Sequence, residues 1–371
     1  TTGNLTEYGE RLYDHVFLAP GATALAASVF SPVQFGEFVN LGGNLLVVVD
    51  SAMPAALRQL AIEFSLEFDD SGTLVMDPLN ALDPADPTRF RVAPSQSRSR
   101  HVTGSMAGPA VFRGIGHRLT GKNPFTFPVL SAHPAAYSDF ETPAAAADGA
   151  VVLDPGAQAG ATMQLVSGFQ ARNNARILFA GSMELFSDAG AAVAAHADTA
   201  STPPNANAAL AQRLAAWTFQ AAGVLRIERQ THHLANETVP RGEYRIGSDL
   251  TYELDVGLWR DGRWQPFDAD VIQFEAKMLE VYVRLPMART AQPYAVTTRL
   301  PWKDGIYTFA VAYYRPGLSY VVASEQVVVR PYRHNEHENR ISIFGLPHYV
   351  NFASMMLAFV LFSLVYLYHQ D

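Results

Sequence analysis

Apolar positions along the first 223 residues switch between the spacing of strands and the spacing of helices. The run 44–49 is almost wholly apolar, which predicts a strand buried on both faces, and strand patterns return at 165–170 and 175–180. Two other stretches carry an apolar residue at every third or fourth position, on the faces Leu57, Leu60, Ala61, Phe64 and Leu210, Leu214, Trp217, Ala221. Strands that alternate with helices favour an α/β domain with a mostly parallel sheet.

Capping residues and glycines mark the ends of the predicted helices. Ser31-Pro32 is a typical N-cap followed by a first-turn proline, and Gly42-Gly43 ends the helix that begins there. Gly223 ends the last amphipathic helix. The stretch 77–150 is rich in Pro, Ala and Ser and has no regular pattern, and its segment 83–87 predicts a loop.

Near Gly223 the pattern changes, which places a domain boundary there. Beyond it, apolar residues alternate with polar or small ones in several short stretches, such as 254–258 and 307–313. Asp261-Gly262 predicts a hairpin turn between two strands. Short strands at this spacing, without a helical stretch, predict an all-β sandwich domain over residues 224–331.

The last part of the chain has the pattern of a membrane anchor. Twenty residues from Tyr349 to Tyr368 carry no charge, which predicts a C-terminal transmembrane helix. Residues 332–348 form a polar membrane-proximal linker before it, and residues 369–371 form a short tail. Ser354 and Ala358 share one helix face, where small side chains let a partner helix approach closely. The alternative to a transmembrane helix is a buried core helix, and the alternative to a packing face is a chance pair of small residues.

Composition excludes several classes of function. A formal net charge of −8 is not the electrostatic footprint of a nucleic-acid-binding protein. The chain has no cysteine, which excludes disulfides, thiolate nucleophiles and cysteine-ligated metals.

The few residue patterns with chemical potential have simpler interpretations. Asp268 and Asp270 have the D-x-D spacing with which two carboxylates can share a divalent cation, but they follow a Pro266-Phe267 turn, so a solvated turn is favoured. Ser182 follows a buried strand as a nucleophile would, yet the second glycine of G-x-S-x-G is missing.

Two pairs of histidines complete the candidate set. His232-His233 are adjacent, and His334 and His337 lie in the membrane-proximal linker; all four are interpreted as ordinary surface histidines. We therefore expect no catalytic residue, no cofactor site and no metal site in this chain.

Short motifs in order along the chain carry a resemblance to a known family. The most specific is the run Gln170-Ala171-Arg172-Asn173-Asn174-Ala175-Arg176. The others are Tyr8-Gly9-Glu10, Leu12-Tyr13-Asp14, Gly42-Gly43-Asn44, Glu67-Phe68-Asp69, Gly181-Ser182, Phe186-Ser187-Asp188, Gly223-Val224-Leu225-Arg226, His232-His233, Pro266-Phe267-Asp268 and Ser354-Met355-Met356-Leu357. By these motifs the chain resembles the DDOST (Wbp-type) family of oligosaccharyltransferase subunits.

The resemblance implies an arrangement across the endoplasmic reticulum membrane. An α/β domain of the flavodoxin-like (GIFT-like) type over 1–223 and a sandwich over 224–331 would be lumenal, and the tail 369–371 would be cytosolic. Relative to the family, a signal peptide and the first strand of the α/β domain are expected to be absent, and the family's tail lysines are missing. A lumenal position would make the sequons at Asn4 and Asn236 candidates for N-glycosylation.

The resemblance also implies a function without chemistry in this chain. The family's members are non-catalytic structural subunits that support transfer of a lipid-linked oligosaccharide to Asn of N-x-Ser/Thr in nascent proteins, and no cofactor is expected in this subunit. The implied partners are the catalytic multi-span subunit, ribophorin-type subunits, other small membrane subunits and the lipid bilayer, with no nucleic acid. From the residues alone, a membrane-anchored glycan-acting enzyme and a single-span receptor ectodomain remain open.

Overall fold

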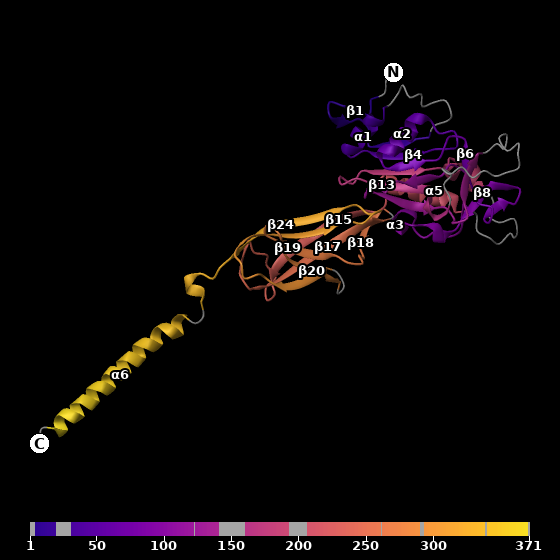
Figure 1. Cartoon of the computed structure of the whole chain (residues 1–371). Helices are drawn as coiled ribbons and strands as arrows, with labels where there is room; N and C mark the ends of the chain where they lie inside the picture. Colours follow the sequence, from indigo (N-terminus) through magenta and orange to yellow (C-terminus); the bar gives the residue numbers. More distant parts are fainter. Residues whose placement is uncertain are drawn as a thin grey trace. The chain divides into compact units, whose positions relative to one another are not determined.

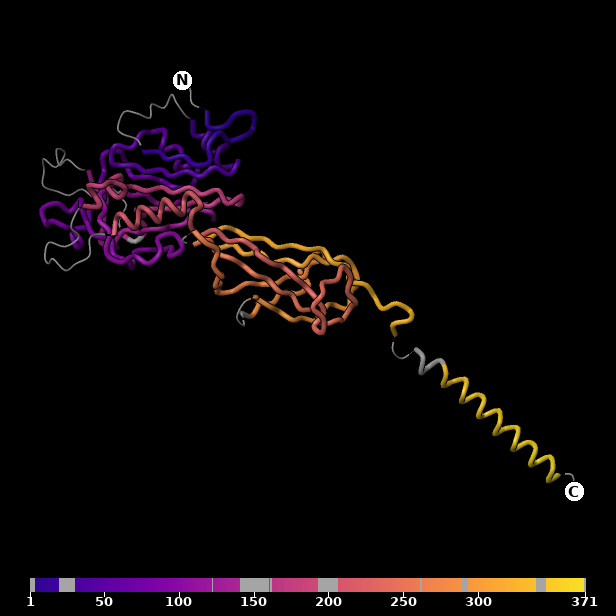
Figure 2. The backbone as a smooth tube through the Cα atoms, turned by 180° about the vertical axis from the view of Figure 1, so that it is seen from behind, coloured from indigo at the N-terminus to yellow at the C-terminus, as the bar shows by residue number. Residues whose placement is uncertain are grey.

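The chain folds into two compact units, each built from separate stretches of sequence (Figures 1 and 2). The computed structural model describes residues 4–19, 31–121, 123–140, 160–192, 206–260, 262–289, 293–337 and 340–369. The first unit comprises residues 1–228, 255–270 and 312–322, and the second comprises residues 229–254, 271–311 and 323–371.

A mixed sheet is the centre of the first unit. Among the described residues it has seven strands, in the order β3-β4-β14-β13-β10-β5, with β11 also paired to β13. Their bounds are β3 His15–Leu18, β4 Asn44–Val48, β5 Leu66–Phe68, β10 His117–Leu119, β11 Thr126–Ser131, β13 Met163–Gln170 and β14 Arg176–Ala180. The pairs β3·β4 and β4·β14 are parallel, whereas those that link β14, β13, β10, β5 and β11 are antiparallel.

The prediction of a mostly parallel sheet is therefore wrong for the half beyond β14. The reason is the short connection between β13 and β14, where the N–H of Ala171 and the carbonyl of Ala175 close a tight turn at 2.9 Å. A turn of this length leaves no room for a crossover helix, so the two strands must run antiparallel.

Helices cover both faces of this sheet. They are α1 Pro32–Asn40, α2 Ala55–Glu63 and α5 Asn207–Thr218. Leu45 and Val47 of β4 belong to the same core cluster as residues of α1 and α2, whereas Leu46 and Val48 belong to the cluster that contains residues of α5. Successive side chains of a strand point to opposite faces, so every residue of β4 is buried, as its apolar run predicts.

The predicted start of α1 is confirmed. Ser31 is its N-cap, and Pro32 is its first residue. The backbone N–H of Gln34 donates to the Ser31 hydroxyl at 3.4 Å, and the N–H of Ser31 donates to the Gln34 side chain at 3.1 Å. This reciprocal pair is a capping box, which satisfies two of the donors that a helix start leaves free.

The predicted end of α5 is wrong by about one turn. The helix ends at Thr218, and Gln220 takes a φ of 58°, so the chain has already turned away before Gly223. The N–H of Ala221 returns to the carbonyl of Ala216 at 2.8 Å, as in a Schellman motif. Ala221 is consequently exposed and does not belong to the buried face of the helix.

The described part of the stretch 77–150, which shows no pattern in the sequence, contributes β10 and β11 to the central sheet and its other strands to two small sheets. β6 pairs with β12, and β7, β8 and β9 form a separate three-stranded sheet. The remaining elements of the first unit up to α5 are β1 Thr6–Glu7, β2 Glu10–Arg11, β6 Thr73–Met76, β7 Ala81–Asp83, β8 Asp86–Val92, η1 Pro94–Gln96, α3 Arg100–Thr103, β9 Ala110–Phe112, β12 Tyr137–Phe140, η3 Gly160–Thr162, η4 Glu184–Phe186 and α4 Asp188–Ala192. The predicted loop 83–87 is the turn of a hairpin in which Asp83 pairs with Asp86.

Beyond Val224 the described chain forms two further sheets. One has the order β15-β17-β22-β21 with β18 paired to β17, and the other has the order β16-β24-β23-β19-β20. Their strands are β15 Val224–Leu234, β16 Glu243–Arg245, β17 Asp249–Arg260, β18 Arg263–Pro266, β19 Gln273–Lys277, β20 Val281–Pro286, β21 Ala288–Arg289, β22 Tyr294–Arg299, β23 Gly305–Tyr313 and β24 Val321–Arg330. The two sheets touch at Tyr252 of β17 and Phe274 of β19, whose ring centroids are 4.7 Å apart.

The predicted hairpin between β17 and β18 is present. Trp259 lies opposite Trp264, and Arg260 lies opposite Arg263. Gly262 has a φ of 75°, which a tight turn of this kind requires. Asp261, the other residue of the predicted turn, lies outside the described residues.

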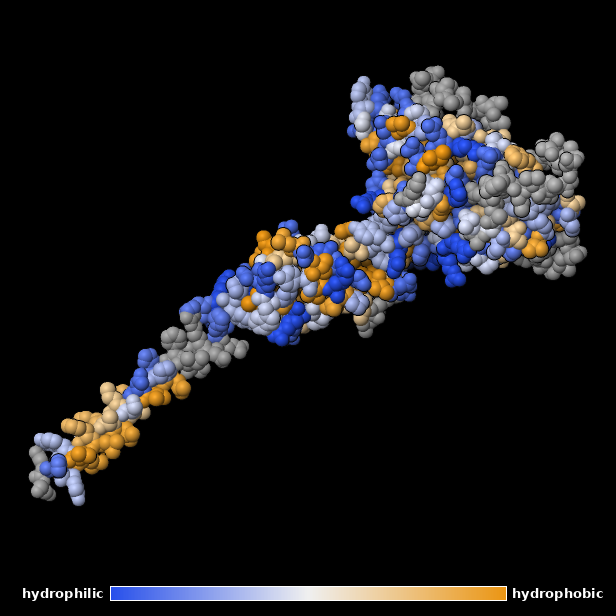
Figure 3. Space-filling model, in the orientation of Figure 1, coloured by the Kyte–Doolittle hydropathy of each residue, from blue (hydrophilic) through white to orange (hydrophobic). Residues whose placement is uncertain are grey.

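The last helix, α6, runs from Arg340 to Tyr368 and contains Pro347. It begins inside the segment predicted as linker, after the short η5 helix His334–Glu336. Within the described residues, one helix is long and apolar enough to cross a membrane: residues Gly345–Tyr368, with a mean hydropathy of 2.1 and none of that window buried. Figure 3 shows the apolar residues that cover its surface. A proline is tolerated in a membrane helix because neighbouring groups can bond the freed carbonyl.

Candidate functional sites

The run Gln170–Arg176 forms a polar junction inside the first unit. It comprises the end of β13, the tight turn and the start of β14. Asn174 lies in the turn with a φ of 67°, a conformation that asparagine adopts more readily than most residues. The side chains of Gln170, Asn173, Asn174 and Arg176 all bond to backbone groups of other segments.

Arg176 is the centre of this junction. Its side chain is fully buried, and its guanidinium donates to the carbonyl oxygens of Trp217, Ala222 and Gly223, each at 2.7 Å. Its Cζ lies 5.0 Å from the centroid of the Trp217 ring. Burial lowers the pKa of Arg176 to about 9, which leaves the guanidinium charged at neutral pH. A cation at this place complements the carbonyls at the end of α5.

The segment 312–322 is hydrogen-bonded to the same junction by Gln170, Asn174 and Trp217. Gln170 donates to the carbonyl of Leu318 at 2.6 Å and accepts from the N–H of Gly317 at 3.2 Å. The N–H of Tyr320 donates to Asn174 at 2.6 Å. The indole N–H of Trp217 donates to the carbonyl of Gly317 at 2.8 Å. The junction therefore joins segments that are about 150 residues apart in sequence.

This arrangement is suited to holding the fold and not to catalysis. Its amide and guanidinium groups are engaged with backbone atoms, and none of these side chains is a nucleophile or a general acid or base at neutral pH. The sequence identified the run as distinctive, but it gave no sign that the groups it bonds lie in α5 and in residues 317–320.

A buried Ser–His pair lies elsewhere in the same sheet and was missed in the sequence. His117 Nε2 and Ser167 Oγ are 2.7 Å apart, the distance of a nucleophile and its base. Both residues have no exposed surface, and burial lowers the pKa of His117 to about 3. A substrate cannot reach a pair enclosed between strands, so this contact is part of the core.

Asp69 carries a perturbed carboxyl group at the end of β5. Burial raises the pKa of Asp69 to about 6, while the positive charges of Arg58 and Arg118 act in the opposite direction. The backbone N–H of Asp69 donates to the carbonyl of Gly116 at 3.1 Å. Such a group is a candidate acid or base, but Asp70 and the two arginines around it make an ion cluster rather than a cleft.

The structure places Ser182 where it supports a turn. It has no exposed surface, and its hydroxyl donates to the carbonyl of Arg113 at 2.6 Å and accepts from the N–H of Leu185 at 3.3 Å. Asp268 and Asp270 are both exposed, in agreement with a solvated turn. Among the residues that the structure describes, no group of three or more His, Asp or Glu side chains is arranged to hold a metal ion.

The surface interpretation of the histidines is wrong for His232. Its side chain is only 2% exposed, and its Nδ1 lies 2.7 Å from the hydroxyl of Tyr244. His233 points to the other side of β15 and is partly exposed, because neighbours in a strand face opposite ways. His334 and His337 are exposed, as predicted.

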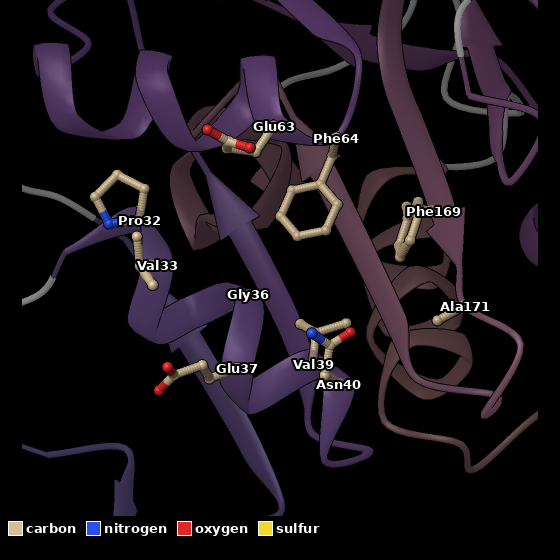
Figure 4. A pocket seen from close by; sticks show the side chains of 10 residues that line it. All are labelled: Pro32, Val33, Gly36, Glu37, Val39, Asn40, Glu63, Phe64, Phe169 and Ala171. Carbon is tan, nitrogen blue, oxygen red and sulfur yellow. The ribbon is translucent and has the colours of Figure 1, made fainter.

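A shallow groove lies between α1, the end of α2 and the end of β13 (Figure 4). Its volume is about 380 Å³, and Phe64 and Phe169 form one wall. Glu37 and Glu63 are the ionisable residues among those that line it. Two carboxylates beside apolar walls give no indication of a reaction.

The predicted modification and packing residues are accessible. Asn4 and Asn236 are both exposed, and Asn236 lies in the turn after β15. Ser354 and Ala358 are exposed on α6, and the Ser354 hydroxyl donates to the carbonyl of Asn351 at 2.9 Å. The hydroxyl is therefore satisfied by its own helix, which leaves a smooth small-residue face.

Comparison with known proteins gives one consistent result. Residues 1–221 match the family model described as the OST48 N-terminal domain, and residues 232–370 match the OST48 middle domain. Three relatives are called dolichyl-diphosphooligosaccharide–protein glycosyltransferase 48 kDa subunit. They come from Caenorhabditis elegans (35% identical, 99% of this chain and 83% of the relative), Danio rerio (32%, 99% and 83%) and Arabidopsis thaliana (31%, 99% and 84%).

Similarity to solved structures adds no argument. A crystal structure of a β-glucosidase from Listeria innocua matches 29% of this chain and 16% of its own length, at 16% identity. The TM-score of 0.18 is too low to indicate a common fold.

Proposed function

The chain belongs to the OST48 family, and we propose that it is a non-catalytic structural subunit of the oligosaccharyltransferase complex. The observation that carries this proposal is similarity over 99% of the chain to relatives that bear that subunit's name. In this role the chain supports transfer of a lipid-linked oligosaccharide to Asn of N-x-Ser/Thr sequons. The transfer itself belongs to a catalytic multi-span partner, and this chain requires no cofactor.

The burial and internal hydrogen bonding of the polar side chains in the first unit support a role without catalysis. Ser182, Ser167 and His117 are buried and bonded within the core. Arg176 is held by backbone carbonyls. The polar side chains of these four residues thus stabilise the first unit.

The membrane arrangement is part of the same proposal. α6 anchors the chain in the endoplasmic reticulum membrane, with both units in the lumen and the C-terminus in the cytosol. The two sheets beyond Val224 form the layers of a β-sandwich. A lumenal position makes Asn4 and Asn236, both exposed, acceptors for glycans.

The test is co-purification with activity. We expect the tagged full chain, extracted in mild detergent, to bring down a multi-span partner, ribophorin-type subunits and activity toward an N-x-Thr peptide. Activity should disappear when the chain is separated from its partners. Activity of the chain alone, lost on Asp268→Asn with Asp270→Asn, would instead support a glycan-acting enzyme, and a chain without partners at the cell surface would support a receptor.

The face of Ser354 and Ala358 is the proposed contact with a partner helix. Ala358→Leu fills this face and should reduce co-purification of partners several-fold, because close helix approach needs small side chains. Ala353→Leu is the matched control: it adds the same atoms about 140° around the helix. Equal effects of the two substitutions would contradict a specific face.

A further inference from the structure

Three exposed apolar side chains lie at one end of the sheets of the second unit. Leu279 is 96% exposed, Trp302 is 64% exposed and Ile306 is 61% exposed. Single exposed apolar residues are common on proteins, but a group at one end of a unit calls for an explanation.

Backbone contacts show that these residues share one end. Leu279 lies in the turn after β19, in which the N–H of Met278 donates to the carbonyl of Glu280 at 3.0 Å. The Met278 sulfur lies so close to Gly305 that a Cβ there would come within 2.7 Å of it. Ile306 is the next residue, at the start of β23, so Leu279 and Ile306 are neighbours.

Trp302 connects this group to the strand that leads to the membrane. Its ring lies against Gly247, where a Cβ would come within 2.9 Å of the ring. The N–H of Ile246, the residue before Gly247, donates to the carbonyl of Arg330 at 3.0 Å. Arg330 is the last residue of β24, so Trp302 lies beside the point where the chain leaves the sheet.

The distance from this end to the membrane helix is limited by the chain. Arg330 forms a two-point ion pair with Glu336, at 2.8 and 2.9 Å, which holds the chain back against the sheet end. Arg340 is four residues further on, at most about 14 Å of extended chain. The apolar span begins at Gly345, about 8 Å along the helix. The sheet end is thus within about 22 Å of the bilayer.

We propose that Leu279, Trp302 and Ile306 form an interfacial foot with which the second unit rests on the lipid surface of the membrane that α6 crosses. Tryptophan and aliphatic side chains at the boundary between headgroups and acyl chains are typical of interfacial contacts. Around these three side chains, the positive charges of Lys303 and of Arg299, whose Cζ lies 5.4 Å from the Trp302 ring, are balanced by Asp304 and Glu280. The surface therefore fits neutral headgroups and does not depend on anionic lipid.

The absence of cysteine permits a direct test with single labels. The chain with Leu279→Cys, labelled with an environment-sensitive fluorophore, is reconstituted into phosphatidylcholine vesicles that contain a phosphatidylcholine with a spin label near its headgroup. Val271→Cys is the matched control, because Val271 is 47% exposed and precedes the five-residue strand β19 that Leu279 follows. Phe359→Cys, within the span, reports whether the chain is inserted.

We expect quenching at position 279 to exceed that at position 271 by at least about twofold, and Trp302→Ser with Ile306→Ser to remove most of the difference. Equal quenching at 279 and 271 would overturn the proposal. So would an unquenched label at 279 that becomes shielded only in the purified complex, because another subunit would then cover the foot. The comparison of 279 with 271 is made on preparations in which the label at 359 is quenched, so that the anchor is inserted in every chain compared.

Discussion

The two units of this protein use arginine in opposite ways. In the first, Arg176 is fully buried and donates to carbonyl oxygens, and burial lowers its pKa to about 9. In the second, Arg330 is the last residue of the inner strand β24, and its ion pair with Glu336 raises the arginine pKa and lowers the Glu336 pKa to about 2. One cation is surrounded by neutral dipoles, and the other faces an anion beside water.

The difference shows what each contact contributes. A buried guanidinium has lost its hydration, so its N–H groups must find acceptors within the protein. The hydrogen bonds that satisfy them hold the accepting segments in fixed positions. A pair at the surface is screened and adds little to stability, but it can restrict a short linker. We therefore expect the Arg176 contacts to determine the fold of the first unit and the Arg330 pair to act only locally.

The largest effect is expected from Arg176→Met. The substitution keeps much of the volume but leaves the carbonyls of Trp217, Ala222 and Gly223 without their charged donor, and it should lower the free energy of unfolding by about 3 kcal/mol. Urea unfolding of the full chain in detergent, followed by tryptophan fluorescence, measures it. Arg172→Met, at an exposed arginine of the same run, should cost less than about 0.5 kcal/mol.

Arg176→Lys sharpens the same comparison. Lysine keeps the charge but lacks the planar fork that reaches several carbonyls at once, so an intermediate loss is expected. If methionine were tolerated as well as arginine, packing rather than hydrogen bonding would hold the junction.

Asp69 provides a second, pH-dependent measure of burial in the first unit. The pKa of Asp69 is raised to about 6 in the folded state from an ordinary value of 3.8, so between these pH values the folded chain holds a proton that the unfolded chain has released. The contribution of Asp69 to the free energy of unfolding is therefore lost as the pH rises through about 6. The gain in stability from Asp69→Asn should therefore grow between about pH 4 and pH 7, by up to about 3 kcal/mol, and then level off. If the difference in the free energy of unfolding between Asp69→Asn and the unchanged chain did not vary with pH, burial would not raise the pKa of Asp69 in the folded state.

The smallest effect is expected at the surface pair. Glu336→Gln should leave the urea unfolding midpoint unchanged. Hydrogen exchange of the Arg333 amide, which donates to Glu336 at 2.9 Å, should become at least about twofold faster. Since the pKa of Glu336 is near 2, lowering the pH from 7 to 5 should not release this contact in the unchanged chain.

Glu280→Gln, an exposed glutamate in the turn after β19, is the matched control for this exchange experiment. An unchanged amide in Glu336→Gln would mean that the linker is held by other groups. The Arg330–Glu336 pair would then not be what keeps residues 331–336 against the sheet end.

Local patterns predicted the regular elements where one face or both were apolar. β4, α1, α2 and the hairpin at Gly262 appear where the sequence indicates them, because their periods, caps and turn residues act over a few neighbouring positions. The mixed sheet, the strands within 77–150 and the burial of His232 were not predicted, because pairing partners and enclosure depend on residues far away in sequence.

The sequence by itself determined the mixed α/β, strand-rich character of the chain, the uncharged span of α6 and the Gln170–Arg176 run as a distinctive motif. Only the tertiary structure decided what that motif does, because its bonds reach Trp217, Gly223 and Leu318, and hydrogen bonding between distant segments leaves no periodic trace. The same holds for the foot. Leu279, Trp302 and Ile306 come together only where β19 and β24 end and β23 begins.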